Sequence, residues 1–163
     1  MTATRRPPKE LPLTFQIHNF KDNDDITVIA SRGMFSVLEY AKDLSVNAQS
    51  AQQAYFEAQM NVRRRQVLIE LGGGTATVQA GAMQWMAGQV ALTSGVKGAG
   101  DLIGKMFRGA VIGESAVKPQ YAGTGVVVLE PTTKHVLLVD LSQWGGGIVV
   151  EDGMFLASEG GIE

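Results

Sequence analysis

The sequence predicts an all-β fold: a duplicated β-roll or double-stranded β-helix-like sandwich with one short helix. Three observations point to it: twenty glycines among 163 residues, short runs of β-branched residues between those glycines, and one pattern that occurs twice. The copies lie at residues 67–83 and 136–155. Each has an apolar strand with an acid near its end, a triple-glycine corner, a second strand, and a lone glycine before an apolar pair. Such self-similarity is typical of duplicated supersecondary units.

The chain divides into three predicted parts. Residues 1–12 form a disordered tail, 13–60 an N-terminal β extension, and 61–163 the duplicated roll, whose second copy is incomplete. The tail is basic and proline-rich but lacks the apolar stretch of a secretory signal, so we predict a soluble cytoplasmic protein. Ten residues follow Gly153, too few to match the first copy. We therefore expect either a decayed duplication or the front part of a longer protein.

The extension begins with a polar turn over residues 21–25. Alternating apolar and polar residues predict a strand over 35–40, with residues 43–48 as its hairpin partner. The alanine- and glutamine-rich stretch 48–60 favours a helix by composition. The adjoining strands favour a loop instead, and we predict a loop that enters a long strand at about Phe56.

That long strand, residues 56–71, carries three consecutive arginines, Arg63 to Arg65. Because side chains alternate between faces along a strand, at least one arginine points to the less exposed side. It then needs a carboxylate partner or a subunit boundary. We favour an intersubunit ion-pair strand over a nucleic-acid stripe with Tyr55 and Phe56 as stacking platforms, because the net charge of the chain is −2.

After the first glycine corner, strands are predicted over 75–80 and 83–93, followed by a flexible loop over 95–100. Asp101 is a suitable N-cap for the short helix expected over 102–108. Five more short strands complete the pattern, at residues 115–121, 125–130, 135–141, 148–151 and 154–157.

The motifs that resemble chemical sites have structural explanations. Gly72–Gly74 and Gly145–Gly147 lead into strands, whereas a phosphate-binding loop opens a helix. His18 and His135 are too few for the histidine-rich metal site of a cupin, and residues 22–25 lack the later ligands of a calcium loop. The absence of cysteine removes disulfides and thiolate chemistry. We assign no catalytic, cofactor-binding or metal-binding residues and predict that the protein is not an enzyme.

Composition favours assembly. Charged residues make up 18% of the chain, below the roughly 25% of ordinary soluble domains, so we expect some surface to be buried against another chain. The first hypothesis is a structural or assembly protein that acts as a homo-oligomer, with an unknown protein partner as a further option. The second is a binding module for a small ligand or RNA, on a β surface lined by Arg63, Arg65, Trp85 or Tyr121. The net charge disfavours nucleic acid.

Three separated stretches resemble a known family: QAGAMQWM (79–86), GTGVVVLEP (123–131) and DGMFLASE (152–159). In order and spacing they are similar to the family named for the yeast protein "altered inheritance of mitochondria 24", and the resemblance runs over residues 65–163. It implies a duplicated β-roll related to the tryptophan RNA-binding attenuation protein fold, in a family that tends to self-associate. It brings no catalytic residues, and no motif here matches the tryptophan or RNA sites of the attenuation protein.

Two departures from that family stand out. Gly72–Gly74 replaces an acidic corner that many members have. Members also usually continue well past the Phe-Leu-Ala stretch at 155–157, so Glu163 is expected to fall inside the domain. The mitochondrial members are associated with inner-membrane organisation, which implies a scaffold role or membrane association for this chain by analogy alone.

Overall fold

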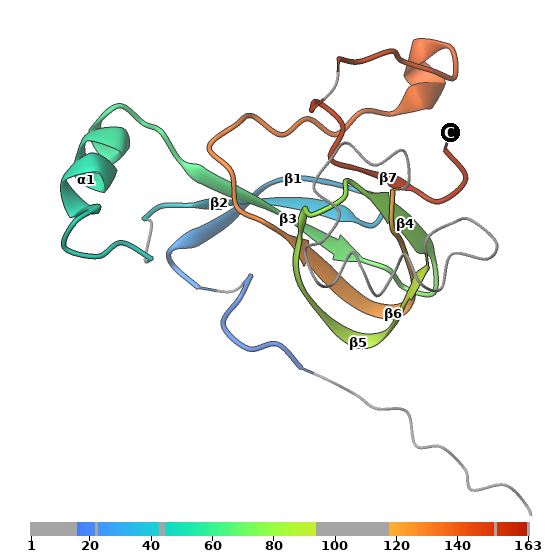
Figure 1. Cartoon of the computed structure of the whole chain (residues 1–163), viewed down its shortest axis with the longest axis horizontal. Coiled ribbons are helices and arrows are strands. Elements are labelled where there is room, and N and C mark those ends of the chain that lie inside the picture. Colours follow the sequence, from blue (N-terminus) through green and yellow to red (C-terminus); the bar gives the residue numbers. More distant parts are fainter. Residues whose placement is uncertain (1–15, 22, 43–44, 94–117, 152, 163) are drawn as a thin grey trace, which may run out of the picture.

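In the computed structural model, one antiparallel sheet curls on itself, and the residues described are 16–21, 23–42, 45–93, 118–151 and 153–162 (Figure 1). Its strands are β1 (Ile26–Arg32), β2 (Phe35–Tyr40), β3 (Arg64–Glu70), β4 (Thr75–Val78), β5 (Met83–Thr93), β6 (Gln120–Leu129) and β7 (Ala157–Glu159). The helix α1 (Ala51–Gln59) and the 3-10 helix η1 (Leu141–Trp144) lie outside the sheet. The mostly β fold is confirmed. The loop 95–100 and the helix 102–108 that we predicted fall outside the described residues.

Strand β6 organises the sheet. β5 pairs with it along its whole length, from Met83↔Leu129 to Thr93↔Gln120. The opposite edge of β6 is shared: β3 pairs with its C-terminal half and β4 with its N-terminal half. β2 and β1 extend the sheet beyond β3, and β7 extends it beyond β4.

The first triple-glycine corner joins β3 to β4 without leaving β6. The amides of Leu71 and Gly73 donate to the carbonyls of Gly125 and Gly123 at 3.0 and 2.9 Å. Gly72 and Gly73 have φ values of +54° and +91°, a region that favours glycine because it has no Cβ. The predicted corner between two strands is therefore confirmed. The chain bends there and stays hydrogen-bonded to β6 before and after the bend.

The main core fills the concave side of the sheet, and its eight buried members are Val67, Ile69, Leu71, Ala76, Val78, Tyr121, Val127 and Leu129. Along β3 the side chains alternate, so Leu68 points to the other side. There it joins Leu38 and Val128 in a smaller cluster. Phe20 and Trp85 cover that cluster, with their rings edge to face at 5.5 Å between centroids.

A buried amide ties four strands together on the side of the smaller cluster. Gln66, on β3, is 4% exposed. Its Oε1 accepts from the hydroxyl of Tyr40 at 2.5 Å, and its Nε2 donates to Gln84 Oε1 and to the carbonyl of Leu129, both at 2.7 Å. Burial raises the pKa of Tyr40 above its usual value. The polar side chain is tolerated in the interior because its donors and acceptor are bonded.

Two predictions for the N-terminal extension were wrong. The hairpin partner of β2 is β1, joined by a turn at Gly33 (φ +54°), and not residues 43–48. The stretch that we expected to be a loop entering a strand at Phe56 forms α1, and β3 begins only at Arg64. The helix ends before Asn61, whose φ of +59° is left-handed, a conformation that asparagine tolerates at helix ends.

The second copy of the repeated pattern does not repeat the structure of the first. The predicted strands 135–141 and 148–151 have no strand ladder, and the second glycine corner follows η1. Asp140 caps η1, since its carboxylate accepts from the amide and the hydroxyl of Ser142 at 3.0 and 2.7 Å. A strand needs a neighbouring edge with free backbone groups, and within the described residues these two stretches pair with no strand. The strand expected over 154–157 is shifted, as β7, to 157–159.

Candidate functional site

The arginine run of β3 is neutralised within the chain. Arg65 is the least exposed of the three, with 13% of its side chain accessible, and its Nη2 lies 2.8 Å from Glu39 Oε2 on β2. The cross-strand register places the two residues directly opposite each other. The prediction that one arginine points to the less exposed side, and needs a carboxylate partner or a subunit boundary there, is met by a carboxylate, although we favoured an intersubunit ion pair. That carboxylate comes from the same protomer.

The other two arginines face α1. Arg64 Nη2 lies 3.8 Å from Glu57 Oε2. Arg63 donates to the carbonyl of Ala41 at 2.7 Å and to the side chain of Asn61 at 3.1 Å, and among the described residues no carboxylate pairs with it. A hollow of about 30 Å³ between α1 and the ends of β2 and β3 is lined by Lys42, Arg63, Arg64 and Glu57, among others. This end of the protomer is therefore basic.

The four residues proposed for a ligand-binding β surface do not share a face. Tyr121 is 3% exposed and belongs to the main core, where burial raises the pKa of its phenol. Trp85 packs on the smaller cluster on the other side of the sheet. Arg65 is occupied by its ion pair, and Arg63 by Ala41 and Asn61. These residues do not form a common binding surface.

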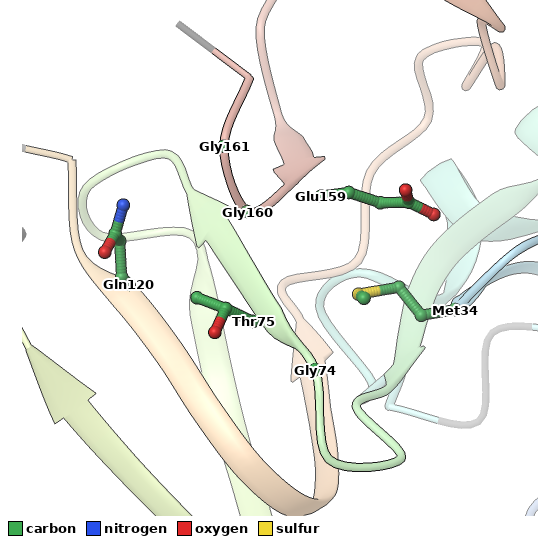
Figure 2. Close-up of a pocket in the computed structure, with 7 residues that line it drawn as sticks. All are labelled: Met34, Gly74, Thr75, Gln120, Glu159, Gly160 and Gly161. Carbon is green, nitrogen blue, oxygen red and sulfur yellow. The ribbon is translucent and has the colours of Figure 1, made fainter.

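An open pocket of about 490 Å³ lies at the ends of β4, β6 and β7, beside the turn between β1 and β2 (Figure 2). Its lining residues are Met34, Gly74, Thr75, Gln120, Glu159, Gly160 and Gly161. The Glu159 side chain extends over the β1–β2 turn, and a Cβ on Gly33 would come within 2.5 Å of its Oε1. Glu159 is the only charged side chain of the lining, so the pocket holds no pair of carboxylates for acid–base catalysis.

The segment after β6 exposes an unusual amount of apolar surface. We call residues 137–150 the apolar segment. Six of its large side chains are more than two-fifths exposed: Leu137 (79%), Val139 (42%), Trp144 (58%), Ile148 (42%), Val149 (99%) and Val150 (41%). Large apolar side chains left exposed so close together in the sequence make this segment a candidate interaction surface.

A second exposed apolar group surrounds α1, and we call Tyr55, Phe56, Met60 and Val62 the α1 surface. These side chains are 61%, 57%, 78% and 40% exposed, and the two aromatic rings meet edge to face at 5.5 Å. The helix buries none of its residues. Its one charged residue, Glu57, is held by Gln53 at 2.7 Å and lies near Arg64.

Within the described part of the chain, no three histidine, aspartate or glutamate residues gather in a way that would hold a metal ion. Over the same ranges, no helix has the length and apolarity required to span a bilayer. His18 and His135 are both exposed and far apart in sequence.

Sequence reasoning missed the α1 surface and the Gln66 network. A signal for α1 was present, because alanine and glutamine favour helices and Asn47 supplies turn-forming bonds to the amides of Gln49 and Ser50. No comparable signal marks Gln66, since its burial depends on strand pairing.

Comparison with known proteins gives one match. A family model described as Mitochondrial biogenesis AIM24 matches residues 56–163. Searches of curated proteins and of solved structures found no match to this chain.

Proposed function

The chain belongs to the Mitochondrial biogenesis AIM24 family, and on that premise we propose that it is a non-enzymatic structural or assembly protein that acts as a homo-oligomer. The observation that carries the proposal is the apolar segment. Val149 is almost completely exposed, and it lies between two further exposed apolar residues. Burying one such side chain contributes about 1.5–3 kcal/mol, so covering the segment is a substantial driving force for association.

The same proposal includes the duplicated roll. Residues 136–139 and 148–150 are rich in valine, leucine and isoleucine, which favour strands. In the protomer these residues belong to no strand. Burial of their side chains against another chain would stabilise a roll in the second copy of the pattern.

The alternative, a binding module for a small ligand or RNA, has weaker support. The residues suggested for it are divided between two faces of the sheet, and the pocket in Figure 2 has a carboxylate and no cation. A carboxylate repels the phosphates of RNA. Cytoplasmic location remains part of the main proposal.

Sedimentation equilibrium of the full chain over a range of concentrations tests the proposal. We expect the wild type to have a mass above that of one protomer, 17.4 kDa. Val149→Glu places a charge on the most exposed side chain of the apolar segment and should shift the protein towards the protomer mass. Gln89→Glu adds the same charge at an exposed position on β5 and should leave the mass unchanged. A wild type that stays monomeric at every concentration would overturn the proposal.

A further inference from the structure

The apolar segment and the α1 surface lie at opposite ends of the protomer. Figure 1 shows α1 at one end of the long axis, whereas η1, inside the apolar segment, lies towards the other. One protomer therefore cannot cover its own apolar segment with its own helix. A contact between the two surfaces has to be made between two copies of the chain.

The two ends carry opposite charges. Around α1, three cations (Lys42, Arg63 and Arg64) line the hollow that contains one carboxylate, Glu57. Residues 136–151 include two acids, Asp140 and Glu151, and no lysine or arginine.

Part of this charge is neutralised within the protomer. Asp140 forms an ion pair with Arg32, Lys42 lies 3.9 Å from Asp25, and Arg64 lies 3.8 Å from Glu57. Within the described ranges no cation pairs with Glu151, and no carboxylate pairs with Arg63. Opposite charges at the rims of two apolar surfaces steer those surfaces together and disfavour contact between two copies of the same surface.

The helix α1 is also expected to be only marginally stable within an isolated protomer. It has nine residues and none of them is buried, whereas isolated helices shorter than about 12–15 residues are marginal in water. Its outward residues are alanine, glutamine and two aromatics, with no charge directed to solvent. A helix of this composition is suited to packing against an apolar partner.

We infer that the α1 surface of one protomer docks on the apolar segment of the next, in a head-to-tail contact that rests on the proposed homo-oligomer. Tyr55 and Phe56 cover apolar side chains of the segment, and the basic end around Arg63 faces Glu151. A head-to-tail contact uses two different patches, so it closes into a ring or continues as a filament.

Complementation between two variants tests this geometry. Tyr55→Glu/Phe56→Glu places two charges on the α1 surface, so that this surface can no longer dock. Val149→Glu places a charge on the apolar segment and blocks docking there. Each variant alone should sediment at the protomer mass. An equimolar mixture should form a heterodimer of twice that mass and nothing larger, because the intact segment of one variant accepts the intact helix of the other.

Two controls keep the outcome clear. Gln89→Glu/Thr93→Glu adds two charges on exposed positions of β5 and should assemble as the wild type does. Circular dichroism and thermal melting of each variant should show the wild-type fold. If a variant does not fold, Tyr55→Ser/Phe56→Ser and Val149→Ser replace it, since they remove apolar surface without adding charge.

Three results would overturn the inference. If Val149→Glu is a monomer but Tyr55→Glu/Phe56→Glu keeps the wild-type mass, the apolar segment associates with another surface, and the proposed function stands alone. If each variant dimerises by itself, the surfaces pair with their own kind. If the wild type is itself a monomer, the inference fails together with the proposed function.

Discussion

Replacing Gln66 with leucine measures how much the hydrogen bonds of its buried amide contribute to the free energy of unfolding. The substitution keeps a similar volume on β3 but removes the bonds to Tyr40, Gln84 and Leu129. Tyr40 is partly exposed and Gln84 exposed, so both can turn to water. Leu129 is fully buried, and its carbonyl loses a donor that water cannot replace. A buried group left without its partner costs about 1–3 kcal/mol. We expect Gln66→Leu to lower the free energy of unfolding by about 2 kcal/mol, roughly a 30-fold change in the folding equilibrium.

Urea unfolding followed by tryptophan fluorescence measures this change. All variants should be compared at one protomer concentration, because association stabilises the folded state by mass action. Tyr40→Phe removes only the phenol donor and should cost about 1 kcal/mol. The double variant should cost less than the sum of the two, because both substitutions break the same bond. A Gln66→Leu midpoint within about 0.5 kcal/mol of the wild type, a change typical of unremarkable surface positions, would show that the network does not stabilise the fold.

Three further predictions each concern the local contacts of one residue. Gly125→Ala would place a Cβ 2.3 Å from the carbonyl oxygen of Ala87 on the paired strand, so we expect a loss of about 1–3 kcal/mol; an unchanged urea midpoint would contradict this. Glu39→Gln leaves Arg65 without its charged partner and should cost about 1 kcal/mol, since the pair is partly exposed; adding Arg65→Met should recover stability, and a further loss would refute the explanation. Hydrogen bonds from the hydroxyl and amide of the serine two residues later hold the pKa of Asp140 below its ordinary value of 3.8, and Arg32 lowers it further. Its contribution to stability is present above that ordinary value and is lost as the pH falls through the lowered pKa; an NMR titration of the carboxyl that gives an ordinary pKa would disprove it.

Local patterns in the sequence were sufficient for several strands. β5 was predicted over residues 83–93, which are its bounds in the structure. Its run of mostly apolar residues lies between glycines, and no other pattern in that stretch favours a different structure. The corner at residues 72–74 was predicted because three consecutive glycines interrupt two strand-like runs. The alternation of side chains was also enough to predict that an arginine of the run at residues 63–65 needs a carboxylate or a subunit boundary. It could not decide between the two or identify Glu39 as the partner.

The same local patterns could not predict which strands pair or which side chains are buried. Alternation identified β2 but not its partner, since the choice between residues 26–32 and 43–48 depends on which turn the chain adopts. The repeated pattern predicted strands at residues 135–141 and 148–151, yet a strand exists only beside another strand edge. The two exposed apolar surfaces were missed for a related reason. A run of valines looks the same in the sequence whether the fold covers it or leaves it exposed.

Because β6 pairs with strands on both of its edges, it also determines which parts of the molecule can unfold locally. Its backbone is bonded along both edges, so its amide hydrogens should exchange with solvent only when the whole sheet unfolds. β7 has three residues and pairs only with β4 among the described strands, and α1 is anchored by few contacts. These elements should open in local fluctuations that leave β6 intact. If assembly uses α1, its amides should become slower to exchange as the protein concentration rises, and those of β6 should slow as well, because association stabilises the whole folded state by mass action.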